Sequence, residues 1–517
     1  MKSVASAAIS HWSNNQLIVS MFRLLLFFAL FPLCLRGEKK PNILWIFSED
    51  LSPYMGCYGD PTNRGFTPVI DQFAAQGVLF KRAFVPAPVC SACRSAMITG
   101  VMQTTTGTHQ HRSSRWTDGI VVPEEVRIHL PKAIKTIPEL MREAGYFTFN
   151  SGKDDYNFHY DRTKLYTVGS RKDYQPGQNG WQGNRSQHYM SLTKDTWNAR
   201  PDKSQPWFGQ IEIKGGKAGN RYTRKGQLLQ PEDVALPPYF PDRPAIRKAW
   251  TTHYNAARGA DVRVHAILKQ LEEDQELENT IIFFFSDHGN NQSIRHKQFC
   301  YEGGVHIPLM IQGNHPALKR GTVRNEIVNA LDIPATTLAF GGVELPDYLD
   351  GQNLFGDDYQ AVNYVVSARD RCDYTIDKIR TVRTDRYRYL RNYYPERAML
   401  QAQYRDNRPE VLEMHAAYKD GTMTPYQAKH WFGQRPQEEL YDLEKDPHQV
   451  HNLANDPYYS SELKKHRQLL EDWIKRTNDK GQLPEATLQL KATYDLWKNR
   501  DIFKNAKVNP EYDQFRE

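Results

Sequence analysis

Two almost wholly apolar stretches stand out along the chain, at residues 42–47 and 281–285. Runs of this length are typical of strands that are buried on both faces of a sheet. Residues 67–77 and 136–145 carry helix signals, because each begins with Thr and an early Pro and ends at Gly. A further amphipathic face extends from residue 264 to 271. Strands that alternate with helices predict an α/β fold with a large, mainly parallel sheet sandwiched by helices.

The pattern changes beyond about residue 360. Residues 378–392 are typical of a two-stranded hairpin, and residues 439–443 predict another short strand. The apolar face of a late helix follows, formed by Leu463, Leu470, Trp473 and Ile474. We therefore expect a main domain over residues 38–360 and a smaller C-terminal subdomain over residues 361–517, with an antiparallel sheet and a packed helix.

The first 37 residues have the pattern of a signal peptide. Arg23 precedes an apolar run from Leu24 to Leu35, and a charged segment begins at Arg36. The run is too short to span a bilayer, and no later segment is long and apolar enough to do so. We therefore expect a secreted or periplasmic protein with no membrane span. Cys34 leaves open whether the mature protein is soluble or lipid-anchored.

The composition is typical of a soluble globular protein, with 39% hydrophobic and 25% charged residues among 517. The net charge of +7 is spread along the chain. This distribution favours a solvated surface, and we expect no nucleic-acid partner. Removal of the leader leaves five of the six cysteines, which are too few and too scattered for a disulfide framework.

Acidic and imidazole side chains follow both apolar stretches. Glu49 and Asp50 come directly after the first, and Asp287 and His288 follow the second. Because ligands gather at the carboxyl ends of parallel strands, we expect these four side chains at one edge of the sheet. Three carboxylates so close together repel one another unless a cation lies between them. A single Asp after a strand is commonly a helix cap or turn residue, but two such pairs favour a metal site.

Residues 88–100 read Pro-Val-Cys-Ser-Ala-Cys-Arg-Ser-Ala-Met-Ile-Thr-Gly. This segment resembles the signature of the formylglycine-dependent type I sulfatases, a family of the alkaline phosphatase superfamily. The resemblance implies an alkaline phosphatase-like fold and oxidation of Cys90 to formylglycine. The hydrated aldehyde offers one hydroxyl to attack sulfur, and its second hydroxyl later expels sulfate by restoring the aldehyde. Ala92 and Cys93 stand where Pro and Ser are more common in the family.

Further motifs resemble the same family in order along the chain. Residues 41–50 resemble its opening strand, and residues 286–289 resemble its second metal motif. The implied ligands of a single Ca²⁺ are Glu49, Asp50, Cys90, Asp287 and His288. The implied catalytic residues are Cys90, Arg94, Lys153, His109, Lys217 and Lys297. The implied substrate-binding residues are His111 and Arg371.

Two lysines belong to motifs that bind sulfate in the family. Lys153 ends a segment that begins at Gly145 and resembles the second family signature. The histidine that the family usually has two residues later is Asp155 here. Lys297 lies four residues before Tyr301-Glu302-Gly303-Gly304, which matches the lysine that contacts sulfate from the other side.

The general acid is the position at which this chain departs furthest from the family. Lys217 stands where many sulfatases have the histidine that protonates the leaving oxygen. A lysine holds sulfate well but is a poor proton donor at its ordinary pKa. His109 and His111 follow the Cys90 helix and are alternative acids, so the identity of the general acid stays open.

The resemblance implies hydrolysis of sulfate esters or sulfamates on an extracellular sulfated carbohydrate. It implies Ca²⁺ and formylglycine as cofactors, and a formylglycine-generating maturase as a partner. The motif variants are similar to those of heparan N-sulfatase-like members. Two alternatives stay open: a phosphonate monoester hydrolase or phosphodiesterase of the same superfold, and a catalytically inactive glycan-binding relative.

Overall fold

The centre of a large sheet explains why two stretches of the sequence are apolar at almost every position. The computed structural model describes residues 39–113, 124–169, 196–504 and 506–516. The two apolar stretches form the neighbouring parallel strands β1 and β6, which pair from Asn42↔Thr280 to Ser48↔Ser286. Side chains alternate between faces, so that Trp45 enters one hydrophobic core while Leu44 and Ile46 enter another.

The sheet has eight strands in the order β4-β3-β5-β1-β6-β7-β2-β8. Their bounds are β1 Asn42–Ser48, β2 Val78–Phe84, β3 Phe147–Ser151, β4 Val168–Gly169, β5 Trp207–Ile213, β6 Thr280–Ser286, β7 His306–Gln312 and β8 Thr322–Asn329. Strand β7 runs antiparallel to both of its neighbours, β6 and β2. The other described pairings in this sheet are parallel.

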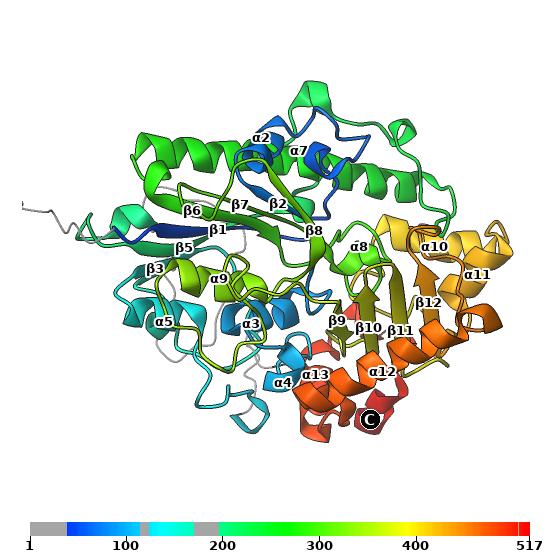
Figure 1. Ribbon diagram of the computed structural model, residues 1–517. Helices are drawn as coiled ribbons and strands as arrows, with labels where there is room; N and C mark the ends of the chain where they lie inside the picture. Colours follow the sequence, from blue (N-terminus) through cyan, green and yellow to red (C-terminus); the bar gives the residue numbers. More distant parts are fainter. Residues whose placement is uncertain (1–38, 114–123, 170–195, 505, 517) are drawn as a thin grey trace, which may run out of the picture. The chain divides into compact units, whose positions relative to one another are not determined.

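Helices cover both faces of this sheet (Figure 1). Helices α2 and α7 supply apolar side chains to the core on one face, and helices α3, α5 and α9 supply those on the other. The bounds are α2 Pro68–Ala75, α3 Cys90–Thr99, α4 Gln103–Thr106, α5 Ile137–Glu143, α6 Arg162–Leu165, α7 Pro244–Glu273, α8 Glu302–Val305 and α9 Asp332–Phe340. The proline and glycine signals therefore predicted α2 and α5 correctly.

A second, smaller sheet is antiparallel throughout, in the order β12-β11-β10-β9. Its strands are β9 Tyr364–Arg369, β10 Ile379–Thr384, β11 Tyr387–Asn392 and β12 Glu438–Asp442. The helices of this part are α10 Pro409–Lys419, α11 Pro425–Phe432, α12 Ser460–Thr477, α13 Thr487–Trp497 and α14 Asp501–Lys504. Helix α12 lies across this sheet (Figure 1), and Leu470 and Trp473 share a core with Val382 of β10.

The predicted fold class is confirmed, since a large, mainly parallel sheet between helices is joined by a smaller antiparallel one. Residues 41–517 form one structural unit, and the boundary near residue 360 stays a prediction. The predicted signal peptide lies outside the described residues. All five described cysteines are free thiols. Within the described ranges, no helix is both long enough and apolar enough to cross a bilayer.

Candidate active site

The carboxyl ends of β1 and β6 bring two pairs of polar residues together, as the sequence pattern predicts. Ser48 lies opposite Ser286, and the Asp50 N–H donates a 2.9 Å hydrogen bond to Asp287 Oδ1. Asp50, Asp287 and His288 are all completely buried. Asp50 has a φ of 56°, in the left-handed region, so the surrounding contacts must hold its backbone there.

The side chains of Asp50, Cys90, Asp287 and His288 converge on one point. One potential ligand atom from each lies within 4.8 Å of the other three. His288 Nδ1 is 2.8 Å from the Gly289 carbonyl oxygen. In the neutral imidazole this nitrogen therefore carries the proton, and Nε2 presents its lone pair to the cluster.

The charge in this cluster also suits a cation. Burial lowers the pKa of His288, but the carboxylates of Asp287 and Asp50 outweigh burial and raise it to about 10. The two buried acids thus favour positive charge at this point. The four converging side chains are two carboxylates, one imidazole and the Cys90 thiol, with no second histidine. With an oxygen in place of the Cys90 sulfur, this set fits an oxygen-preferring divalent ion such as Ca²⁺.

Cys90 is the first residue of α3 and is surrounded by lysines. Its Sγ lies 3.2 Å from Lys297 Nζ and 3.9 Å from Lys217 Nζ. Burial opposes ionisation of this thiol, but Lys153, Lys217 and Lys297 outweigh it and lower the pKa of Cys90 to about 6. In contrast, burial holds the pKa of Cys93 well above its ordinary value. The position of Cys90 therefore stabilises negative charge, and that of Cys93 does not.

Glu49 contacts two lysines rather than the converging ligands. Its Oε1 lies 2.8 Å from Lys153 Nζ and 2.7 Å from Lys217 Nζ. Glu49 is completely buried, whereas the Lys217 side chain stays 28% exposed. The resemblance assigns Glu49 to the metal ion, but the converging set does not include it. Because Glu is one methylene longer than Asp, its carboxylate extends further from the strand end, where it meets the lysines.

The Arg94 guanidinium connects three parts of the site through hydrogen bonds. Its Nε donates a 3.1 Å hydrogen bond to Asp287 Oδ2, and its NH2 donates one of 2.6 Å to Glu212 Oε1. A third bond, of 2.9 Å, runs from NH1 to the Lys153 carbonyl oxygen. These partners occupy all three guanidinium nitrogens, so Arg94 positions Asp287 and does not face an open site.

Sequence reasoning missed Glu212 as a site residue. Glu212 lies near the end of β5, paired with Phe47 of β1, and it also accepts a 2.6 Å hydrogen bond from the Lys153 N–H. Burial raises the pKa of Glu212, and Glu49 adds to this effect against the opposing charge of Arg94. The available signal was an acid at the end of a buried, mostly apolar strand, the same strand end as Glu49.

A glycine pair brings Lys217 to the site. Gly215 and Gly216 lie in the short 3₁₀ helix η4, Gly215–Ala218, which passes close to the end of β1. A Cβ at Gly215 would lie 2.4 Å from the Glu49 carbonyl oxygen, and one at Gly216 would lie 2.0 Å from that of Asp50. Only glycine allows this approach of the two backbones.

Three further predicted residues lie outside the Cys90 cluster. His111 Nδ1 lies 2.7 Å from the Ser91 hydroxyl, behind the start of α3. Arg371 donates hydrogen bonds from Nε and NH2 to the Glu485 carboxylate, so these two nitrogens already have a partner within the protein. Burial lowers the pKa of His109, whose nearest charged groups come from the second sheet and the C-terminal segment. None of the described contacts of His109 or Arg371 is with the Cys90 sulfur.

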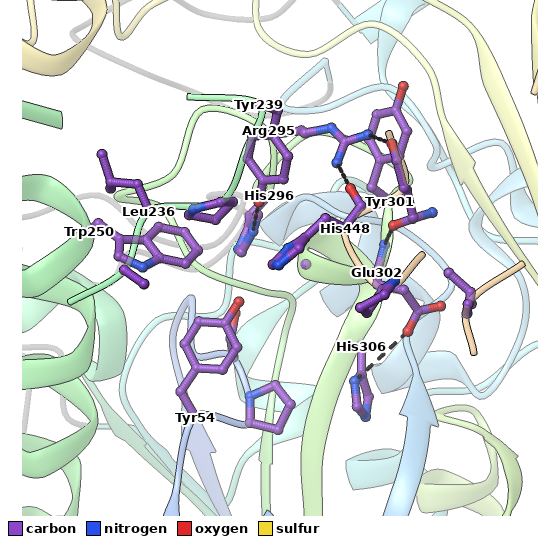
Figure 2. A pocket seen from close by; sticks show the side chains of 18 of the residues that line it. Tyr54, Leu236, Tyr239, Trp250, Arg295, His296, Tyr301, Glu302, His306 and His448 are labelled. Atoms are coloured by element: carbon purple, nitrogen blue, oxygen red, sulfur yellow. Dashed lines mark hydrogen bonds and ion pairs between the residues drawn. The ribbon is translucent and has the colours of Figure 1, made fainter. Parts of the chain in front are cut away.

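A cavity of about 540 Å³ lies beside these elements (Figure 2). One side carries aromatic rings, with Tyr54 and Trp250 5.9 Å apart between ring centroids. On another side the Arg295 guanidinium lies 3.8 Å from the ring centroid of Tyr301. None of the predicted site residues lines this cavity, although Lys297 follows Arg295 by two positions.

Comparisons with known proteins agree with this geometry. The sulfatase family model matches residues 41–343. An ulvan-active sulfatase from Formosa agariphila is 29% identical over 481 residues, covering 88% of this chain and 78% of the relative. An N-sulphoglucosamine sulphohydrolase from Homo sapiens is 24% identical over 498 residues, covering 87% of this chain and 93% of the relative.

Solved structures agree in fold. A 2-O GAG sulfatase has a TM-score of 0.61 at 21% identity, covering 86% of this chain and 94% of that one. The phosphonate monoester hydrolase of Agrobacterium radiobacter has a TM-score of 0.60 at 16% identity, covering 84% and 96%. Identities this low show the fold alone, whereas the family match covers more than half of the chain. The chain therefore belongs to the sulfatase family and is a sulfuric ester hydrolase.

Proposed function

We propose that this sulfatase removes sulfate from a carbohydrate, with a formylglycine made from Cys90 and with Ca²⁺. The observation that carries the proposal is the position of Cys90. Its Sγ lies 3.2 Å from both Lys297 Nζ and His288 Nε2, so the group at this position adjoins both a cationic side chain and the converging ligands. The names of the relatives, which refer to ulvan and sulphoglucosamine, support a carbohydrate substrate.

Asp50, Asp287 and His288 would hold the ion, together with the oxygen that replaces the Cys90 sulfur. When bound, Ca²⁺ would supply positive charge beside the sulfate oxygens. Arg94 keeps Asp287 in place through its 3.1 Å hydrogen bond, since a carboxylate with a fixed partner cannot turn away from the ion.

Three lysines would hold the sulfate group. Lys297 Nζ lies between Asp50 and Cys90, and Glu49 positions the ammonium groups of Lys153 and Lys217. Fixed positive charges of this kind stabilise the negative charge that develops on sulfate oxygens in the transition state. A formylglycine at position 90 would supply, as its hydrate, the hydroxyl for attack on sulfur. We assign Lys217 to sulfate binding, because Glu49 holds its ammonium group in place through a 2.7 Å contact.

Export and maturation belong to the same proposal. The signal-peptide pattern of residues 1–37 supports a periplasmic or extracellular location, where sulfated polysaccharides would be met. Conversion of Cys90 requires a formylglycine-generating maturase, because the reaction replaces the thiol and one Cβ hydrogen with a carbonyl oxygen. The proposal covers both O-sulfate and N-sulfate substrates.

Mass spectrometry of the tryptic peptide that contains Cys90 tests the nucleophile. We expect a loss of roughly 18 Da at Cys90 and none at Cys93. Cys93→Ser is the matched control and should keep the modification, whereas Cys90→Ala should lose activity. Full activity in enzyme with an unmodified Cys90 would contradict the proposal.

Rates on two synthetic substrates separate the proposed activity from its nearest rival. An aryl sulfate should be hydrolysed faster than the corresponding aryl phosphate diester or phosphonate monoester. The opposite order would favour a phosphonate monoester hydrolase or phosphodiesterase, and no turnover of any of them or of sulfated oligosaccharides would favour an inactive glycan-binding protein.

A further inference from the structure

Three residues beside the active site share an uncommon backbone conformation. Arg112, Asp155 and Asp373 have φ values of 60°, 55° and 51°, in the left-handed region that residues other than glycine rarely adopt. They come from distant parts of the chain: the segment after α4, the segment after β3 and the connection between β9 and β10. Strained conformations persist only where the surrounding structure holds them, and they collect at active sites and ligand-binding sites.

The side chains of these residues form one charged cluster. Arg112 Nε lies 3.5 Å from Asp155 Oδ1, and Arg112 NH1 lies 3.8 Å from Asp373 Oδ1. The other oxygen of Asp155 lies 2.8 Å from Nζ of Lys153. The cluster is thus joined directly to a lysine that we assign to the sulfate.

Arg112 is also within electrostatic reach of Cys90. Burial lowers the pKa of its guanidinium, but the two aspartates, Cys90 and Tyr404 outweigh burial and raise it. The same Tyr404 contributes to the raised pKa of Lys297. Arg112 and Lys297 therefore share two electrostatic neighbours, Cys90 and Tyr404.

The guanidinium of Arg112 is charged and held in place, yet its donors are unused. In the parts of the chain that the structure describes, it donates no hydrogen bond, because both carboxylates lie beyond hydrogen-bond length and Nε has no partner. Its side chain is 18% exposed, whereas those of Asp155 and Asp373 are 0% and 4% exposed. A guanidinium carries five N–H donors in a planar fork.

We infer that Arg112 binds a second anionic group of the substrate, beside the sulfate that is removed. The inference rests on the proposed function. The group is a carboxylate or another sulfate on the same carbohydrate, since the planar fork matches both oxyanions in a two-point contact. Asp155 and Asp373 keep the fork oriented without occupying its donors. Arg112 thereby makes the enzyme selective for sugars with two acidic groups.

The test uses two pairs of substrates. One pair is a sulfated disaccharide with a uronic acid and its carboxyl-reduced, neutral form. The other is a disulfated sugar and the monosulfated sugar that keeps the sulfate to be removed. We expect wild-type kcat/KM to be about 10- to 100-fold higher for the more acidic member of one pair. This factor corresponds to the free energy of one charge-assisted hydrogen bond. Arg112→Gln should abolish most of this preference, and Arg112→Lys should keep part of it because the charge remains.

Each outcome separates this inference from its alternatives. The pair that shows the preference distinguishes carboxylate from sulfate. No preference in the wild type would overturn the inference. Equal losses by Arg112→Gln on both members of each pair would also overturn it, since Arg112 would then act only through Asp155 and Lys153. A wild-type enzyme that hydrolyses no sulfate ester would instead reject the proposed function.

A second variant keeps the inference testable if Arg112→Gln fails to fold. Asp373→Asn retains Arg112 but removes one of the charges that orient it, with almost no change in side-chain size. We expect it to reduce the preference for the more acidic sugar. An unchanged preference in a folded Asp373→Asn protein would count against the role of this cluster.

Discussion

Replacing Glu49 with glutamine is expected to destabilise the protein while leaving its metal content intact. The substitution keeps the size of the side chain and removes the negative charge that lies 2.8 Å from Lys153 Nζ and 2.7 Å from Lys217 Nζ. Burial raises the pKa of Glu49, but Lys153, Lys217 and Arg94 outweigh it and hold the pKa well below its usual range. The carboxylate is therefore charged in the folded protein at neutral pH.

The distances set the scale of the effect. At an effective dielectric constant of 20, each ammonium–carboxylate contact at this separation is worth about 6 kcal/mol before desolvation is subtracted. Removing one partner from a buried pair typically costs about 3–5 kcal/mol. Because Lys217 is 28% exposed, water compensates part of its lost partner. We therefore expect Glu49→Gln to lower the free energy of unfolding by about 3 kcal/mol.

Two measurements test this expectation. Urea unfolding of the metal-free proteins gives the loss of stability, and elemental analysis gives the calcium bound per chain. Lys217→Met in the Glu49→Gln background should recover part of the stability, with a coupling of about 1–3 kcal/mol, because it removes an unpaired charge. Asp287→Asn is the control that should lose calcium. Loss of calcium from Glu49→Gln, with unchanged stability of the metal-free protein, would refute the reasoning and make Glu49 a ligand of the ion.

Two further substitutions test separate parts of the structure. Asp332→Asn should stabilise the protein increasingly as pH rises. Burial raises the pKa of Asp332 to about 7 in the folded protein, whereas its pKa in the unfolded chain is near 4. Between these two pKa values the unfolded chain ionises more readily, so the wild-type protein loses stability that the neutral Asn keeps. The gain in the free energy of unfolding should be small below about pH 4 and reach up to about 4 kcal/mol above pH 7. An equal gain at pH 5 and pH 8 would contradict this. Lys217→Ala should slow an aryl sulfate and a sugar sulfate alike, by about 10²- to 10³-fold in kcat, if Lys217 holds sulfate. A large loss confined to the sugar sulfate would show that Lys217 protonates the leaving group.

The sequence predicted the fold where a pattern has one structural meaning. Apolar runs bounded by acidic residues indicated β1 and β6, and parallel strands necessarily present their carboxyl ends at one edge. The direction of β7 was not predictable, since a buried apolar strand has the same composition in either direction. The last segment showed no clear pattern because its apolar residues, such as Trp497 and Phe503, are sparse and pack against Tyr374 of a distant loop.

The site residues also differ in how far their local sequence reveals them. Motifs predicted Cys90 and Lys297, whose chemistry is tied to a local sequence. Glu212 was missed because its importance depends on its neighbours across the sheet, β1 and the Arg94 side chain, and not on residues beside it in the chain. Glu49 was assigned to the ion from its motif position, whereas its closest described contacts are with Lys153 and Lys217, and its role at the ion stays a prediction.

Backbone strain is the part of the site that local sequence hides most completely. Asp50, Arg112, Asp155 and Asp373 adopt left-handed φ values at or beside the Cys90 cluster. Each such conformation costs of order 1–3 kcal/mol, and Arg112 is the most unusual of the four because Asp adopts the left-handed region more readily than most residues. The cost is offset by contacts with segments far away in the chain, which is why a sequence pattern cannot reveal it. Natural proteins depart from local rules mainly at functional sites. The grouping of four such residues at or beside the Cys90 cluster therefore agrees with a binding region that extends from the ion ligands to Arg112.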